Sequence, residues 1–119
     1  MNRKELIDYI EENYNVTPEY LWSKYPNYAI FRHKNNSKWF AAIMDVSENK
    51  LSDDGENKII DIINLKAMPN LVGSLRLKKG VYSAYHMNKE HWVSIKLNCE
   101  FNEKELQSLI SESYDLTQK

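Results

Sequence analysis

The residues best suited to chemistry lie in one nine-residue stretch, Ala84-Tyr85-His86-Met87-Asn88-Lys89-Glu90-His91-Trp92. It contains two of the three histidines of the chain, together with an indole, an amide and an ammonium group. Imidazoles bind metals and transfer protons, whereas indole and amide groups stack on bases or hydrogen-bond to them. The stretch therefore has three interpretations: a metal or catalytic site, a nucleic-acid surface, or a structural turn.

The spacing of the histidines argues against a metal. His86 and His91 are five positions apart, which places them on opposite faces of a continuous strand, so they need an intervening turn to reach one ion. Glu90 is the one carboxylate at a useful spacing, and His33 joins them only through tertiary contact. Cys99 is the single cysteine, which excludes a cysteine-based zinc site. We expect no metal and no cofactor.

Motifs for catalysis are also absent from the sequence. The chain has no nucleophile motif and no glycine-rich phosphate loop, and it contains three glycines in all. An enzyme would need His86 or His91 as a general acid-base in a pocket that sequence does not reveal. The acids of the first helix (Glu5, Asp8, Glu11 and Glu12) are spaced as a solvated helix face. We expect a protein that is not an enzyme.

The nucleic-acid interpretation rests on local charge. From Lys66 to Lys96 the chain has six lysine and arginine residues against Glu90 alone, a local charge of +5 in a chain whose overall charge is −1. Cations there could contact phosphates while the polar and aromatic groups contact bases. The candidate nucleic-acid-binding residues are Arg76, Lys78, Lys79, His86, Asn88, Lys89, His91, Trp92 and Lys96.

A structural interpretation stands beside it. Asn88 and Lys89 then form a turn between two strands, Trp92 fills the core, and the His and Asn side chains satisfy nearby backbone groups. The lysines in that case only keep strand edges soluble.

Length and composition indicate one domain covering residues 1–119, because 119 residues with 42% apolar content suit a single core. No apolar run approaches the roughly 18 residues that span a bilayer, and no apolar signal segment follows Met1. We expect a cytoplasmic protein with no membrane partner. The lone cysteine agrees with a reducing compartment.

Hydrophobic periodicity and turn signals supply the elements that position these residues. Capping boxes at Asn2/Glu5 and Asn102/Glu105 predict a first and a last helix. Tyr20, Leu21 and Trp22 are expected to fill the core. The predicted elements are a helix ending near Asn13, a helical turn at Thr17–Trp22, strands at Tyr28–His33, Lys38–Val46, Lys58–Lys66, Val81–Met87 and Trp92–Leu97, a short helix from Pro69, and the last helix.

This order, α-β-β-β-α-β-β-α, predicts an α+β fold. Strands joined mostly by short turns form an antiparallel five-stranded sheet in a two-layer domain, with the helices on one face.

The run from Gly80 to Val93 resembles the signature of the MmcQ/YjbR family, a small-aromatic-His-x-Asn-Lys-x-His-Trp sequence that enters a strand. Ser113-Tyr114 matches the usual Ser-Tyr near the C-terminus of that family. Trp22 after an acidic-proline segment, Phe31 before Trp39-Phe40, and the helix at Pro69 extend the resemblance over nearly the whole chain.

The resemblance implies an α+β domain of the secretion-chaperone-like kind, also compared with frataxin-like folds, and DNA binding through a "double wing" motif. The sequence therefore predicts a non-catalytic protein whose partner is DNA. The alternative is a protein- or small-ligand-interaction module in which the His-x-Asn-Lys-x-His-Trp turn is structural. Sequence leaves the oligomeric state open.

Overall fold

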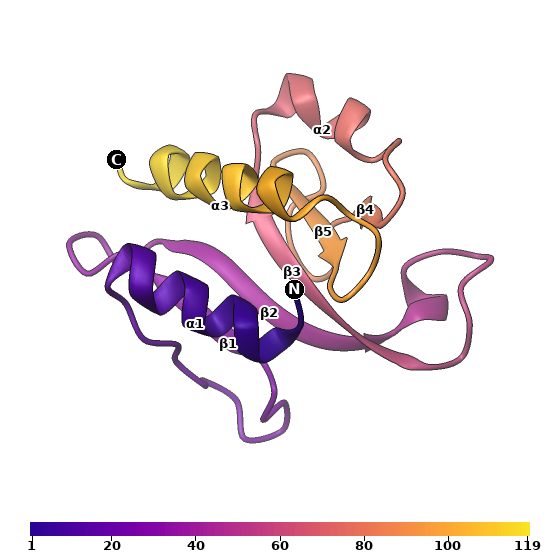
Figure 1. Cartoon of the computed structure of the whole chain (residues 1–119), viewed down its shortest axis with the longest axis horizontal. Helices are drawn as coiled ribbons and strands as arrows, with labels where there is room; N and C mark the ends of the chain where they lie inside the picture. The colour runs from indigo at the N-terminus through magenta and orange to yellow at the C-terminus, as the bar shows by residue number, and fades with distance from the viewer.

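Five antiparallel strands form one sheet in the order β1-β2-β3-β5-β4, in a computed structural model that describes all 119 residues (Figure 1). The predicted α+β class, element order and antiparallel pairing are confirmed. The strands are β1 (Ala29–Arg32), β2 (Trp39–Ser47), β3 (Ile59–Lys66), β4 (Val81–Ser83) and β5 (Trp92–Lys96). The helices are α1 (Arg3–Tyr14), α2 (Pro69–Leu75) and α3 (Glu103–Thr117), and a 3-10 turn, η1 (Glu48–Lys50), follows β2.

One face of the sheet, the helical face, is covered by all three helices. Alternate residues of the strands, such as Ile43, Ile63 and Ile95, pack against Leu6 of α1 and Ile110 of α3 in a cluster of 20 buried residues. Each such side chain contributes roughly 1.5–3 kcal/mol when it leaves water. None of the three helices combines the length and the hydrophobicity of a bilayer-spanning segment.

Local signals at the helix ends agree with this packing only in part. Asn2 and Glu5 form the predicted capping box at the start of α1. Asn102 accepts a hydrogen bond from the amide of Glu105 at 2.9 Å, but the Glu105 carboxylate pairs with Lys78. The capping box predicted for the last helix is therefore half formed.

The other face of the sheet, the open face, has no helix on it. Its residues form a second cluster under loops rather than under helices, with Trp39, Leu51, Ile60 and Tyr85 packed around it. The cluster consists of Tyr28, Ile30, Ala42, Met44, Val46 and Ile62. Figure 1 is drawn with α1 and α3 in front of the sheet, so the open face lies behind.

Two predicted elements are wrong. Thr17–Trp22 is not a helical turn, because Glu19 exchanges two backbone hydrogen bonds with Ile30 at 2.8 and 2.9 Å and so runs beside β1. The strand predicted for Val81–Met87 stops at Ser83, where the chain leaves β5 and enters the loop of the nine-residue motif.

The aromatic segment before β1 also differs from expectation. Tyr20, Leu21 and Trp22 are 53%, 43% and 36% exposed, so they do not fill the core. With no helix to turn them inward, these side chains stay at the surface.

Ser113 locks α3 to the sheet. Its hydroxyl donates to the carbonyl oxygen of Phe40 at 2.6 Å and accepts from the amide of Lys66 at 2.9 Å. The β2–β3 pairing ends at Ala41 and Leu65, so these two backbone groups have left the ladder. One buried hydroxyl thus satisfies a donor and an acceptor where the strands separate.

Replacing Ser113 with alanine should destabilise the fold by about 2–3 kcal/mol, because the buried carbonyl of Phe40 and the partly buried amide of Lys66 lose their partner. Urea denaturation followed by circular dichroism measures this loss. Ser108→Ala, at an exposed position of the same helix, should change stability by less than about 0.5 kcal/mol. Equal effects of the two substitutions would contradict the bridging role.

Candidate functional site

The nine-residue motif is a loop that bonds to itself. Lys89 donates from Nζ to the carbonyl oxygen of Ala84 at 2.7 Å, which closes the loop. The side-chain oxygen of Asn88 accepts a hydrogen bond from the amide of Glu90 at 2.8 Å. The backbone carbonyl of Asn88 accepts one from the amide of Trp92 at 3.0 Å. Asn88 and Lys89 therefore form the turn that the structural interpretation predicted.

A buried polar pair clamps this loop to the open face of the sheet. Asn64 of β3 donates to the carbonyl oxygen of Tyr85 at 2.9 Å, and Ser94 of β5 accepts from the amide of Tyr85 at 2.9 Å. Ser94 also donates to the side-chain oxygen of Asn64. Both side chains are fully buried, so these bonds meet the requirement of polar groups that have left water.

Sequence reasoning missed Asn64. An amide in the middle of the apolar run from Ile59 to Leu65 was its only signal. Such a residue on a central strand needs a partner across the sheet, and that partner is not visible in the sequence.

Most of the predicted phosphate contacts are occupied by acids. Lys78 pairs with Glu105 at 3.0 Å, Lys79 with Glu100 at 3.2 Å, and Lys96 with Glu48 at 2.7 Å. Lys96 shares the open face with Trp92 and Ser94, whereas Lys78 reaches α3 on the helical face. The local charge of +5 is thus divided between two faces and largely neutralised.

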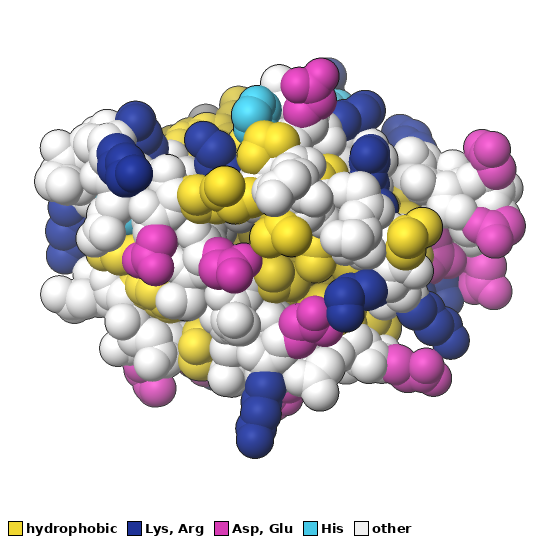
Figure 2. Space-filling view, turned by 90° about the horizontal axis from the view of Figure 1, so that it is seen from above, with side chains coloured by type: hydrophobic (Ala, Val, Ile, Leu, Met, Phe, Trp, Pro, Cys, Tyr) yellow, Lys and Arg dark blue, Asp and Glu magenta, His cyan; other side chains and the backbone are white.

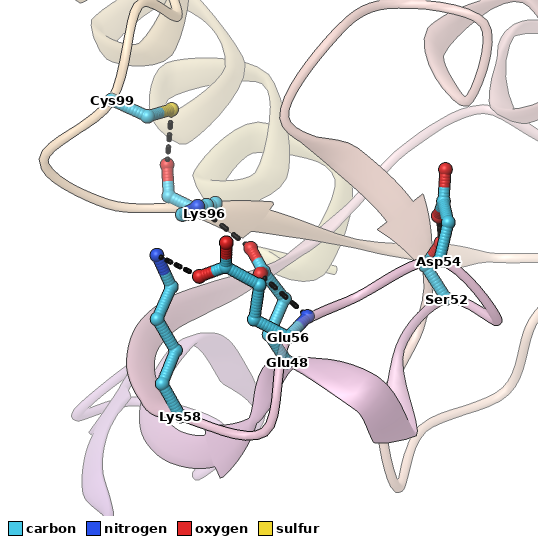
Figure 3. A network of polar contacts seen from close by, with 7 residues as sticks. All are labelled: Glu48, Ser52, Asp54, Glu56, Lys58, Lys96 and Cys99. Atoms are coloured by element: carbon cyan, nitrogen blue, oxygen red, sulfur yellow. Dashed lines mark hydrogen bonds and ion pairs between the residues drawn. The ribbon is translucent and has the colours of Figure 1, made fainter.

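The Lys96 pair is the most enclosed of the three (Figure 3). Hydrogen bonding to Lys96 holds the pKa of the Glu48 carboxyl below its usual range, and the amide of Glu56, at 3.1 Å, adds to this effect. The same contact with Glu48 raises the pKa of Lys96. This lysine fastens the loop after β2 to β5.

Arg76 and Lys89 are the two predicted cations without a carboxylate partner, and they line one groove. The groove has a volume of about 470 Å³ and lies between α2 and the motif loop. Pro69, Val72, Gly73 and Glu90 complete its lining. Figure 2 shows the molecule from above, the side on which α2 lies, with positive and negative side chains interspersed around an apolar centre.

The three remaining residues predicted to bind nucleic acid, His86, His91 and Trp92, have different surroundings. His86 is exposed, has a left-handed backbone (φ 59°), and its ring lies 4.0 Å from that of Tyr85. The carbonyl of His91 accepts from the amide of Ala67 at 2.9 Å. Trp92 is partly exposed on the open face and belongs to neither buried cluster, so the core position that the structural interpretation gave it is wrong.

An aromatic cavity of about 170 Å³ opens on this face of the sheet. Three segments build it: the loop before β1, strand β2, and the motif loop. These residues share no pattern in the sequence, because they come from separate segments. The lining residues are Trp22, Tyr25, Tyr28, Trp39, Met44, His86 and Met87.

The rings of the cavity are arranged as a corner. The Trp22 ring stands nearly perpendicular to the rings of Tyr28 and Trp39, at 82° and 76°, with centroids 5.9 and 5.8 Å apart. Tyr25 and Tyr28 stack on each other at 4.7 Å and 12°. Burial raises the pKa of the Tyr28 hydroxyl, and the adjacent Tyr85 hydroxyl adds to this rise. The wall therefore consists of aromatic rings, two thioethers and the single imidazole of His86.

The third histidine lies on the helical side. His33 is buried, with Nε2 2.7 Å from the hydroxyl oxygen of Thr117 and its ring 4.4 Å from that of Tyr114. It anchors the end of α3 to the β1–β2 hairpin. No cluster of three His, Cys, Asp or Glu side chains suited to one metal ion occurs in the chain.

A small α+β domain with a helical face and a loop-covered open face is thus defined. The YjbR family model matches residues 11–116, and the chain belongs to the YjbR family. The chain is 43% identical to the uncharacterized protein YyaQ of Bacillus subtilis over 117 residues, 98% of each chain.

Solved structures show the same architecture. A crystal structure of a protein from Pseudomonas syringae is 48% identical, with a TM-score of 0.96 over 99% of this chain and 100% of the other. Protein DR2400 of Deinococcus radiodurans is 20% identical, with a TM-score of 0.74 over 99% of this chain and 79% of the other, which shows a shared fold.

The burial of the His33 ring predicts that the stability of the fold depends on pH. Burial lowers the pKa of His33, so the folded protein favours the neutral ring. The stability that the neutral His33 ring contributes is present in full above pH about 6.5, which is its pKa in the unfolded chain. This contribution is lost as the pH falls toward the lower pKa of His33 in the folded protein. The slope contributed by one proton is at most about 1.4 kcal/mol per pH unit.

Urea denaturation at pH 7.5, 6.5 and 5.5 tests this expectation. His33→Gln should be less stable at pH 7.5 and should lose stability less steeply on acidification than the unsubstituted protein. His86→Gln, which leaves His33 in place, is the matched control and should retain the loss of stability that His33 causes on acidification. An unchanged slope in His33→Gln would show that this ring does not titrate in the expected range.

Proposed function

We propose that this protein is a non-catalytic binding module that takes one small group into its aromatic cavity. The observation that carries the proposal is the cavity itself, whose wall is apolar and aromatic with His86 as a polar group at one side. Ligand sites are typically concave and apolar, with a few polar groups that orient the ligand. The volume of about 170 Å³ is close to that of an engineered cavity of about 150 Å³ that binds benzene.

The motif loop supports this proposal through its structural role. The loop is held in place by hydrogen bonds of four side chains, Asn64, Asn88, Lys89 and Ser94. In this position the loop presents His86 and Met87 to the cavity. A rigid wall keeps a site formed before the ligand arrives, which lowers the entropic cost of binding. The sequence motif then serves binding indirectly, by building the wall.

Titration of the ¹⁵N-labelled protein with compact probes tests the proposal. A neutral probe (tert-butanol) and a cationic one (tetramethylammonium) should be compared, with the indole N–H signals of Trp22 and Trp39 as the readout. At least one probe should bind with a Kd of about 1–10 mM, the range expected for so small a ligand. Saturable shifts confined to the cavity support the proposal, and their absence up to about 100 mM would overturn it.

DNA binding is a second candidate, favoured by one observation. Arg76 and Lys89 lack acidic partners and line the same groove beside α2. Two phosphate contacts imply that log Kobs falls against log salt with a slope of about −2, so that affinity drops about tenfold between 50 and 200 mM salt. This is a weak, sequence-independent mode of binding.

Gly73 offers a matched test of DNA binding, because a Cβ placed there meets no atom within 4 Å. Gly73→Glu should put a carboxylate into the groove and abolish binding to mixed-sequence duplex DNA at low salt. Gly73→Gln has nearly the same shape and should retain binding. Fluorescence anisotropy measures both. An affinity no tighter than millimolar for the unsubstituted protein, or equal affinities of the two variants, would contradict this candidate.

A further inference from the structure

The shape of the aromatic cavity selects a class of ligand, an inference that rests on the proposed function. A flat aromatic ligand needs two parallel ring faces with a gap between them. Among the lining rings that touch each other, the parallel pair is Tyr25 and Tyr28, whose centroids are 4.7 Å apart with no gap between the rings. The facing sides of these two rings contact each other and are therefore not available to a ligand.

Trp22 meets Tyr28 and Trp39 nearly at right angles. Trp22 stands at 82° to Tyr28 and at 76° to Trp39, so its ring forms a corner with each of the other two rings. A rounded group fills such a corner and contacts rings on several sides. Indole and phenol faces carry the negative part of the ring quadrupole, so a rounded cation gains more here than a neutral group of equal size.

The rest of the lining agrees with a diffuse positive charge. Met44 and Met87 contribute polarizable thioethers, and no lysine or arginine lines the cavity. No carboxylate lines it either, which disfavours a compact ammonium that would need hydrogen-bond acceptors in exchange for its water. A methylated ammonium has few or no N–H donors and is weakly hydrated, so it suits a wall of rings.

We propose that the cavity binds a di- or trimethylated ammonium group, with Trp22, Tyr28 and Trp39 as the contacting rings. The volume of about 170 Å³ accommodates one such head group, and the remainder of the ligand extends to solvent past Trp22 and Tyr25, which are both exposed. The group can come from a free choline-like compound or from a methylated lysine side chain. Both present the same head to the cavity.

The decisive comparison is choline against its neutral carbon isostere, 3,3-dimethylbutanol, in the intact chain. Their shapes are nearly equal, so the ratio of their Kd values isolates the effect of charge. Choline should bind about five-fold or more tightly, in the range of a partly exposed cation–π contact. Equal or tighter binding of the alcohol overturns this inference and leaves the proposed binding module standing. Binding of neither ligand overturns both.

Ring substitution gives an independent readout. Trp22→Leu keeps an apolar wall but removes the π face, so choline affinity should fall about five-fold while the affinity for dimethylbutanol changes less than twofold. Tyr20→Leu removes a ring that is 53% exposed and does not line the cavity, so it should leave both affinities unchanged. A parallel loss of both ligands in Trp22→Leu would overturn the cation preference.

A charge placed in the wall tests the same point without removing a ring. Met87→Glu should tighten choline binding about three- to four-fold relative to Met87→Gln, as expected for one charge about 5 Å away in a watery environment. Dimethylbutanol should not distinguish the two variants. Failure of glutamate to favour choline counts against a cationic ligand even if a tryptophan variant folds poorly.

Two further ligands separate the sources of the head group. N-acetyl-trimethyllysine amide should bind more tightly than choline if the natural ligand is a methylated protein side chain, and less tightly if it is a free compound. The unmethylated lysine amide should bind at least five-fold more weakly than the trimethylated form. Equal binding of the methylated and unmethylated forms would overturn the inference.

Discussion

The structure depends on a mismatch between its sheet and its helices. The sheet has two apolar faces, but all three helices pack on one of them, in the cluster that contains Leu6, Ile63 and Ile110. The second face, with Met44, Val46 and Ile62, must be kept from water by loops. A loop has no continuous apolar stripe, so large aromatic side chains cover this face of the sheet instead. They leave a cavity between them.

This mismatch explains why the loop of the nine-residue motif is held by so many polar contacts. Backbone groups of an irregular segment lying on a sheet need partners that strands would otherwise supply. Asn64 and Ser94 provide them for Tyr85, and Lys89 and Asn88 provide them within the loop. The histidines and the tryptophan of the motif were the residues that suggested chemistry, whereas the asparagine and the lysine determine the shape.

Most of the fold was predictable because its signals are local. The capping box at Asn2 and the branched residues from Ile59 to Ile63 depend on neighbours a few positions away, and both interpretations are confirmed. Tyr20–Trp22 was placed wrongly because a cap residue followed by proline indicates a helix only if no strand competes. Glu19 pairs with Ile30 of β1, a contact that the local pattern does not contain.

The site was less predictable, because its members come from separate segments. Trp22, Trp39 and Met87 have no common spacing, and only the sheet brings them together. Asn88 and Lys89 form the turn that the structural interpretation described, beside the nucleic-acid interpretation of the same residues. The cations of the same region were judged from a window of sequence, and a window does not show that Glu48 lies beside Lys96.

Neutralised charge and an aromatic cavity together indicate how this surface selects ligands. Pairs such as Lys78–Glu105 and Lys79–Glu100 join segments more than 20 residues apart, so acids and bases alternate over the surface and cancel within a few ångströms. Such a surface produces little long-range field to steer a polyanion. Affinity must then come from contact at short range, where ring faces and shape act. The cavity on the open face supplies both, and it exists because loops rather than helices cover that side of the sheet.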